Sequence, residues 1–340
     1  MSRSAKPAIS ATALIPGLLV SGAAVAALLL LVDFDRTFQA LGSANPGAIA
    51  IATAVFAVGL TGRAAASREL VDRRTGLGGA FAALNIGYLA NNLLPLRVGE
   101  VVRSVVLGRK AGTGFVGGAT AVGAERLLDL IMAATVLIAG ISAVGIETAW
   151  VPAAAAAAAA TAGISALVVI ARRRSEITAW LEPKVAGRPR LASLLPKLSS
   201  ALEGLARPQR LLGASAILGA SWAVAVVCFW IVLRAFIPTA PMGWASFGLG
   251  AMAFGIALPS SPGAIGVYEA VWVGALALCG ADPAAALAFA VSVHALTFTL
   301  TSVCGLVALI LEVPRGAGFA GRAASILRGR DPSTEEEPAR

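Results

Sequence analysis

Charged side chains are scarce in this sequence. Only 13% of its 340 residues are Asp, Glu, Lys or Arg, whereas 58% are hydrophobic and the mean hydropathy is +0.83. Soluble globular domains contain about 25% charged and about 45–50% apolar residues. The composition therefore excludes an ordinary soluble domain and predicts an integral membrane protein that crosses the bilayer several times.

Residues that carry metal, redox or nucleophilic chemistry are also few. The chain has one histidine, His294, and three cysteines, Cys228, Cys279 and Cys304, each within an apolar run. This distribution indicates neither a disulfide framework nor a CxxC site, and the sequence has no Walker motif for ATP hydrolysis. We therefore expect no cofactor, no metal, no nucleic-acid partner and no enzyme activity, since no catalytic constellation is found.

Long apolar runs predict the fold, an all-α polytopic membrane bundle. Two further runs are interrupted by polar segments that contain proline and glycine. We therefore predict about six full spans plus two broken, re-entrant helix pairs, with residues 33–45 forming an external loop. The six expected spans are residues 11–32, 46–61, 113–145, 150–171, 211–237 and 284–311.

Basic residues outside the spans predict the orientation. Residues 172–210 carry nine basic and three acidic side chains, an excess of six within the formal net charge of +9. The positive-inside rule places this loop in the cytoplasm, together with the arginines of residues 63–75 and both chain termini. We expect a cell-membrane protein whose membrane domain covers residues 1–312, with one surface helix in the basic loop and a disordered cytoplasmic tail over residues 313–340.

The first interruption, residues 91–110, combines helix breakers with charge. Pro95 and Gly99 break the helix, and the freed backbone groups need protein or water as partners. A charge at membrane depth costs about 2.5–3.5 kcal/mol on insertion scales, so the charged side chains of this segment must be paired or hydrated. Glu100 and Arg103 either form a structural pair or contact a polar headgroup. The polar residues of this elbow are Asn92, Arg97, Glu100 and Arg103.

A second interruption, at residues 259–270, resembles the first. Pro262, Gly263 and Gly266 break the helix and Glu269 follows, but this segment comes after an external loop instead of a cytoplasmic one. Two such breaks at corresponding positions of opposite topology indicate an inverted repeat with a site near the midplane of the bilayer. We therefore expect the tips of the two elbows to approach each other.

Further polar residues lie inside the expected spans. Glu125, Arg126 and Asp129 share one helical face, and their internal balance of charge favours a structural role. Glu269 has no basic residue within ten positions, so it must find a partner across the fold, stay protonated or face water. This makes it a stronger functional candidate. His294 is interpreted as a core histidine bonded to a neighbouring helix, with a proton relay as the alternative.

Three motifs resemble a known family. They are PLRVGE at residues 95–100, ERLLD at 125–129 and PGAIGVYE at 262–269, and they resemble the flippase-like membrane domain of the lysylphosphatidylglycerol synthases. The resemblance covers roughly residues 46–312. It implies a bundle with re-entrant helices that moves a lipid or a lipid-linked headgroup between leaflets. The full synthases continue into a soluble aminoacyl-transferase domain, which the roughly 28 residues after position 312 are too few to encode, so lipid aminoacylation is not implied.

The predicted function is therefore transbilayer movement of a phospholipid, a glycolipid or a lipid-linked headgroup. Arg97, Arg103 and Arg126 are the candidates for holding a phosphate, and the glutamates would hold these arginines in the empty site or bind a cationic headgroup. Membrane lipids are the expected partners; a separately encoded lipid-modifying enzyme and an oligomer stay open. Two alternatives remain, a membrane glycosyltransferase that uses a polyprenyl-phosphate sugar through Asp33 and Asp35, and a membrane scaffold without transport.

Overall fold

The computed structural model describes residues 15–72, 74–95, 97–145, 150–185, 187–256 and 260–312. This part of the chain is helical and has no strand, which confirms the all-α prediction. The predicted tail over residues 313–340 lies outside the described residues.

The first half of the chain contains α1 (Ile15–Leu31), α2 (Phe34–Ser43), α3 (Pro46–Val71), α4 (Leu77–Leu93), α5 (Gly99–Lys110), α6 (Gly114–Val144) and α7 (Trp150–Arg172). The second contains α8 (Arg174–Val185), α9 (Pro189–Ala192), α10 (Leu195–Leu205), α11 (Pro208–Phe236), α12 (Met242–Gly255), η3 (Pro262–Ala264), α13 (Val267–Leu278) and α14 (Pro283–Glu312).

Five described helices are long and apolar enough to cross a membrane. They are α3, α6, α11, α14 and the segment Ala153–Ile170 of α7, and α1 with α2 adds a sixth span if this pair, bent by 89°, counts as one. The segment predicted as a loop, residues 33–45, is instead largely helical, because Phe34–Ser43 form α2. Asp33 begins this helix by accepting a hydrogen bond from the Arg36 backbone N–H at 3.1 Å, as N-cap residues do.

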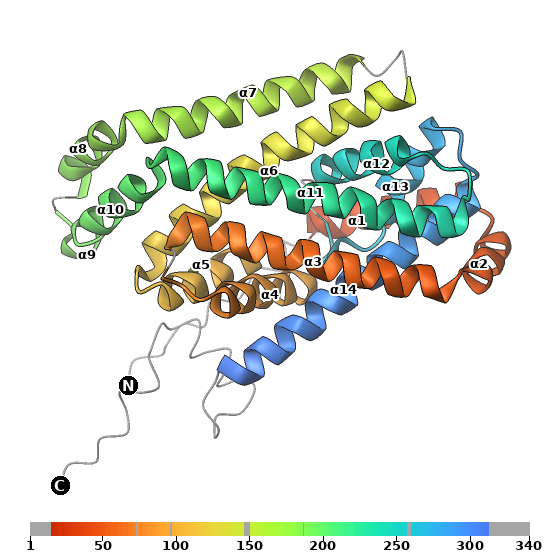
Figure 1. Ribbon diagram of the computed structural model, residues 1–340, viewed down its shortest axis with the longest axis horizontal. Helices are drawn as coiled ribbons and strands as arrows, with labels where there is room; N and C mark the ends of the chain where they lie inside the picture. The colour runs from red at the N-terminus through yellow and green to blue at the C-terminus, as the bar shows by residue number, and fades with distance from the viewer. Residues whose placement is uncertain are drawn as a thin grey trace, which may run out of the picture.

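Both predicted breaks interrupt helices. α4 ends at Leu93 and α5 begins at Gly99, while α12 ends at Gly255 and α13 begins at Val267. Within each pair the two helices pack against each other, so each break forms a hairpin. In Figure 1 the α4/α5 hairpin lies towards the end of the bundle that carries α8, α9 and α10, and the α12/α13 hairpin lies towards the end that carries α2.

The contacts between helices repeat with inverted direction. α3 runs towards the α8–α10 end and α11 runs away from it (Figure 1), and these two helices pack side by side. The contact of α6 with α12 has its counterpart in the contact of α14 with α4, and α5 on α6 corresponds to α13 on α14. The unit α3–α6 is therefore repeated, inverted, as α11–α14, which is the architecture of many transporters.

The two elbows share a backbone conformation as well. Arg97 has φ 53° and Ala264 has φ 57°, and each follows its proline by two residues. A non-glycine residue in this left-handed region costs about 1–3 kcal/mol and persists only where the surroundings enforce it. Two residues further on, Gly99 and Gly266 begin or cap the outgoing helix.

Glycines permit close helix crossings at equivalent places. A Cβ atom on Gly140 of α6 would lie 2.3 Å from the backbone nitrogen of Phe247 in α12, and one on Gly305 of α14 would lie 2.4 Å from the carbonyl oxygen of Asn85 in α4. Neither position has room for a side chain. Each hairpin is thus clamped against the long helix of the opposite repeat.

The basic segment is more ordered than predicted. Residues 172–210 form three helices, α8, α9 and α10, rather than a loop with one surface helix. α10 packs against α6, and its Leu202 is buried. Apolar positions of α10 thus join the bundle; the basic residues of the segment had suggested a solvated loop.

Candidate functional site

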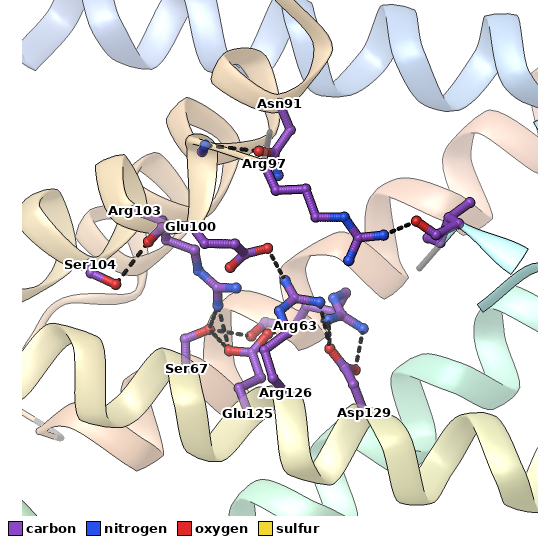
Figure 2. Close-up of polar contacts among 12 residues, drawn as sticks. Arg63, Ser67, Asn91, Arg97, Glu100, Arg103, Ser104, Glu125, Arg126 and Asp129 are labelled. Atoms are coloured by element: carbon purple, nitrogen blue, oxygen red, sulfur yellow. Dashed lines mark hydrogen bonds and ion pairs between the residues drawn. The ribbon is translucent and has the colours of Figure 1, made fainter. Parts of the chain in front are cut away.

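A cluster of charged side chains from α3, α5 and α6 lies between the helices of the first repeat (Figure 2). Arg63 of α3 binds Asp129 through both terminal nitrogens, at 3.0 and 2.6 Å, and also reaches Glu125 at 3.2 Å. The prediction that the second span ends at residue 61, before Arg63, is therefore wrong, because α3 continues to Val71 and carries the arginine inside the bundle.

The most deeply buried pair of this cluster is Arg103 with Glu125. Arg103 is 2% exposed and Glu125 is fully buried, and their side chains form a direct ion pair. Ser67 joins both, since its hydroxyl donates to Glu125 at 2.7 Å and accepts from Arg103 at 2.5 Å. The hypothesis that Arg103 pairs with Glu100 is wrong, because Arg103 points from α5 towards α6 and α3 (Figure 2).

Arg126 and Asp129 link this buried pair to the accessible part of the cluster. The carboxylate of Asp129 accepts from Arg126 at 3.0 Å and from the indole N–H of Trp222 at 3.0 Å. The other terminal nitrogen of Arg126 contacts Glu100 at 2.9 Å. The predicted internal pairing of Arg126 with Asp129 is thus present, whereas Glu125 pairs with arginines of other helices.

Exposure divides the cluster into two layers. The side chains of Arg103 and Glu125 are 3% and 1% exposed, whereas those of Arg126 and Glu100 are 41% and 29% exposed. Arg97, at the tip of the elbow, is exposed too. The buried layer therefore holds α3, α5 and α6 together, and the accessible layer remains available to a ligand.

Arg97 joins the two elbows. Its guanidinium donates to the backbone carbonyl of Ile256, at the end of α12. The expected approach of the two elbows is seen where η3 of the second elbow packs against α4. Arg97 also lies close enough to Arg126 for the two cations to repel each other. Among the described residues no carboxylate lies within ion-pair distance of Arg97.

The cluster has more hydrogen-bond donors than acceptors. The three arginines of the cluster balance its three carboxylates, and Arg97 beside it adds one positive charge in excess. The Nε atoms of Arg63 and Arg103 and the Nη1 atom of Arg103 are buried without an acceptor in the part of the chain that the structure describes. Oε2 of Glu100 is likewise buried without a donor among the described residues, although buried polar atoms normally have partners. An anion bound at the accessible layer would balance the positive charge in excess.

The two asparagines of the first elbow form hydrogen bonds to the elbow backbone and to a neighbouring helix. Asn91 accepts a hydrogen bond from the Gly99 N–H at 2.8 Å across the break. Asn92, a predicted site residue, donates to the hydroxyls of Ser302 at 2.9 Å and Thr301 at 3.2 Å. Asn92 therefore fastens α4 to α14 rather than joining the charged cluster.

Glu269 of the second repeat lies in a separate polar pair. The Glu269 carboxylate lies 2.5 Å from Nδ1 of His294 on α14 and accepts from the Gly266 N–H at 2.7 Å. The expected partner across the fold is thus His294, and the expected bond of His294 to a neighbouring helix is present. The ring of Tyr268 stacks on the imidazole with centroids 4.3 Å apart.

Sequence reasoning missed three residues of the charged cluster. Arg63, Ser67 and Trp222 complete the network with the predicted Glu100, Arg103, Glu125, Arg126 and Asp129. One signal was available, since Arg63 and Ser67 are four residues apart in an alanine-rich run and therefore share a helical face. Trp222 had no such signal. No metal-binding group of histidine, cysteine or acidic residues occurs among the described residues.

Two comparisons with known proteins bear on this site. The model of a family described as "Lysylphosphatidylglycerol synthase TM region" matches residues 14–305. The curated protein "Glycosyltransferase AglD" of Haloferax volcanii is 26% identical in an alignment over 332 residues. The alignment covers 86% of this chain and 53% of the relative. The chain thus spans about half the length of that relative. No solved structure matches.

Proposed function

Because the chain belongs to the family of the lysylphosphatidylglycerol synthase TM region, we propose that it moves a phosphate-bearing lipid headgroup between the leaflets of the cell membrane. A membrane-lipid-related function follows from the family and from the relative. The translocase activity is the proposal, and it rests on the geometry of the first elbow.

The observation that carries this proposal is the accessible cationic pair Arg97 and Arg126. Arg97 lies in the field of both the Arg126 cation and the Glu100 carboxylate, but only Arg126 has carboxylates within ion-pair distance. A phosphate between the two guanidinium groups would relieve their repulsion and accept two hydrogen bonds from each planar fork. Glu100 then has a defined role, because it neutralises Arg126 in the empty site and is displaced when phosphate binds.

The inverted repeat supplies a route for the headgroup. Alternating access in transporters is largely rocking or gating of one repeat against the other around a site at the repeat interface. Arg97 lies at such an interface, since it reaches from the first elbow to the end of α12. We propose that this contact breaks and re-forms as the headgroup passes.

The orientation is part of the proposal. The basic helices α8 and α10 lie at one end of the bundle (Figure 1), and the positive-inside rule places them in the cytoplasm with both termini. A cysteine introduced at Ser193 and treated with an impermeant thiol reagent tests this. We expect labelling only after the cells are opened, and labelling in intact cells would reverse the orientation.

Lipid movement tests the central proposal in reconstituted vesicles. The probe is a phosphatidylglycerol with a fluorophore on one acyl chain, whose outer-leaflet fraction is quenched by dithionite. Arg97→Ala should slow the exchange of this probe at least tenfold. Arg234→Ala is the matched control, because Arg234 also donates to a backbone carbonyl, that of Pro238 at 2.9 Å, but lies at the end of α11. Equal rates for wild type and Arg97→Ala, with both proteins folded, would overturn the proposal.

The name of the relative favours a second candidate, a glycosyltransferase. Asp33 and Asp35 would be its acidic pair, but in this chain Asp33 caps α2 and contacts Arg36. A double change to Asn keeps a good N-cap residue and removes both carboxylates. Under the translocase proposal this variant exchanges lipid at the wild-type rate. Loss of sugar transfer from a polyprenyl-phosphate sugar, in a wild type that performs it, would favour the enzyme.

A further inference from the structure

The second repeat contains a polar pair that the proposed phosphate site does not use. We infer that Glu269 and His294 form a proton-binding site that couples proton movement to lipid translocation. The inference rests on the proposed function and deepens it, since it names the ion that drives the movement. It is argued from the position, the surroundings and the chemistry of the pair.

The pair lies in the second repeat at a place similar to that of Arg103 and Glu125 in the first, within about one helical turn. Glu125 lies eleven residues after Gly114, the start of α6, and His294 lies eleven residues after Pro283, the start of α14. Their partners, Arg103 and Glu269, lie in the first turns of α5 and α13 after the elbow glycines. Both pairs therefore join the outgoing helix of a hairpin to the following long helix.

The two pairs differ in what they can titrate. An arginine keeps its proton at every physiological pH, so the Arg103 side of the first pair carries a fixed charge. Histidine is the side chain whose ordinary pKa falls between pH 5 and 8. The side chains of His294 and Glu269 are 13% and 11% exposed, so the pair is enclosed but still reachable by water. A proton can therefore bind and leave the second pair, while the first pair is permanent.

Few other groups near the pair can take up the proton. α1 and α12 contribute no charged or titratable side chain. α13 contributes Tyr268, which stacks on the imidazole, α11 contributes Cys228, and α4 contributes Tyr88. The remaining charged residues on elements that contact α13 or α14 lie on α2, α3, α5 and α11. They are Asp35 and Arg36 of α2, Arg63, Arg68 and Glu69 of α3, Glu100, Arg103, Arg109 and Lys110 of α5, and Arg210 and Arg234 of α11, and Lys110 pairs with Glu312 of α14.

Proton binding changes the net charge that the elbow carries. Neutral His294 with ionised Glu269 has a charge of −1, and one added proton gives an imidazolium–carboxylate pair with no net charge. A net charge is costly in a low-dielectric interior, whereas a neutral pair is tolerated. The protonated pair therefore favours the enclosed elbow of this structure, and loss of the proton favours an elbow open to water.

Contacts connect this change to the first elbow. The Phe298 ring lies edge-on to the His294 ring, with centroids 6.1 Å apart, and the Phe298 carbonyl accepts from Asn92 of the first elbow at 3.4 Å. Glu269 also holds the Gly266 N–H at the start of α13. A movement of the second elbow would thus reach Asn92 of the first elbow through these contacts.

The first test observes the proton directly. His294 is the only histidine, so full-length protein with ¹⁵N-labelled histidine and an affinity tag without histidine gives one imidazole signal in NMR spectra. We expect this signal to report a change of protonation state over the pH range in which the protein stays folded, and its midpoint to move in Glu269→Gln. A ring that keeps one protonation state over that range would overturn the inference, whatever the transport assay shows.

The second test measures coupling in vesicles that contain the fluorescent phosphatidylglycerol. With one proton moved per lipid, a gradient of about one pH unit shifts the distribution of lipid between leaflets about tenfold. Reversing the gradient reverses the shift. His294→Asn and Glu269→Gln should abolish the response, whereas Tyr268→Phe, which keeps the stacked ring, should retain it.

The outcomes separate the two proposals. If the wild type exchanges lipid but ignores the gradient, the coupling inference is wrong and the translocase proposal stands. If the wild type exchanges no lipid, the translocase proposal is wrong and the coupling falls with it, while the titration still decides whether the pair binds a proton.

Discussion

The two repeats have one backbone plan but different chemistry. In the first, four arginines and three carboxylates surround the elbow, and Arg97, Glu100 and Arg126 are accessible. In the described part of the second, the acidic and basic side chains at the elbow are Glu269 and His294. Helix α1 packs against α13, and the Ser21 hydroxyl accepts from the Ser261 N–H at 2.9 Å. The shared backbone of the hairpins therefore determines where the polar residues lie. The identity of the side chains determines whether an elbow carries fixed charges or a pair that can bind a proton.

The largest effect on stability is expected from a change in the buried layer of the first repeat, and a much smaller one from a change at a partly exposed ion pair. Glu125→Ala would leave Arg103 buried without its carboxylate and Arg63 with only Asp129, and breaking a buried pair costs about 3–5 kcal/mol. We expect little folded protein in detergent extracts. Glu312→Ala, which breaks the partly exposed pair with Lys110, is the control and should yield near wild-type amounts. Normal yield and thermal stability of Glu125→Ala would show that the first repeat does not depend on its buried charges.

Arg126→Lys separates the contribution of the positive charge at this position from that of the planar guanidinium group. Lysine keeps the positive charge but loses the planar fork that contacts Asp129, Glu100 and, as proposed, phosphate. We expect lipid exchange to fall about tenfold, which corresponds to about 1.4 kcal/mol in the barrier, with thermal stability changed far less. An unchanged exchange rate would mean that charge alone is sufficient at this position.

The left-handed residues allow function to be separated from strain. Glycine adopts positive φ without the cost that Arg97 and Ala264 bear, so Arg97→Gly and Ala264→Gly should each stabilise the fold or leave it unchanged, by about 0–1 kcal/mol. Thermal unfolding in detergent measures this. Lipid exchange should be lost only in Arg97→Gly. Equal loss in both variants would indicate that the rigidity of the elbows, and not the guanidinium, is what transport requires.

The smallest effect on lipid exchange is expected at the hydrogen bond that links the cluster to α11 of the second repeat. Trp222→Phe removes one hydrogen bond to Asp129 and keeps the aromatic packing against the cluster. A single hydrogen bond to a charged group contributes about 1.5–3 kcal/mol, and Asp129 retains its two arginines, so we expect the lower part of this range. A decrease in the unfolding temperature of a few degrees, with wild-type exchange, would agree. A variant that unfolds as readily as Glu125→Ala would contradict the division into layers.

The sequence was sufficient to locate the breaks but not the partners. Pro95, Gly99, Pro262 and Gly266 act locally, through fixed φ, a missing N–H or a missing Cβ, and local effects can be read along the chain. Arg63 was assigned to a cytoplasmic segment because the apolar run ends near it. Helix α3 continues past it, since Asp129 and Glu125, more than sixty residues away, satisfy its charge.

The pairing of the elbow charges depended on side-chain direction. Glu100 and Arg103 are three residues apart, and this spacing suggested a pair. Both residues lie in the first turns of α5, yet Arg103 points to the buried layer and Glu100 to the accessible one (Figure 2). The same limit applies to α2 and α10, whose polar composition resembled loops until the contacts with α14 and α6 were known.

Native mass spectrometry of the purified protein with its copurifying lipids tests the central claim most directly. Wild type, the double variant Arg97→Ala/Arg126→Ala and the control Arg234→Ala would be compared at equal folded fraction. The claim that the accessible arginines of the first elbow hold a phosphate headgroup predicts that wild type and control retain a phosphate-bearing lipid, and that the double variant retains at least tenfold less. Equal lipid occupancy in all three proteins would contradict it.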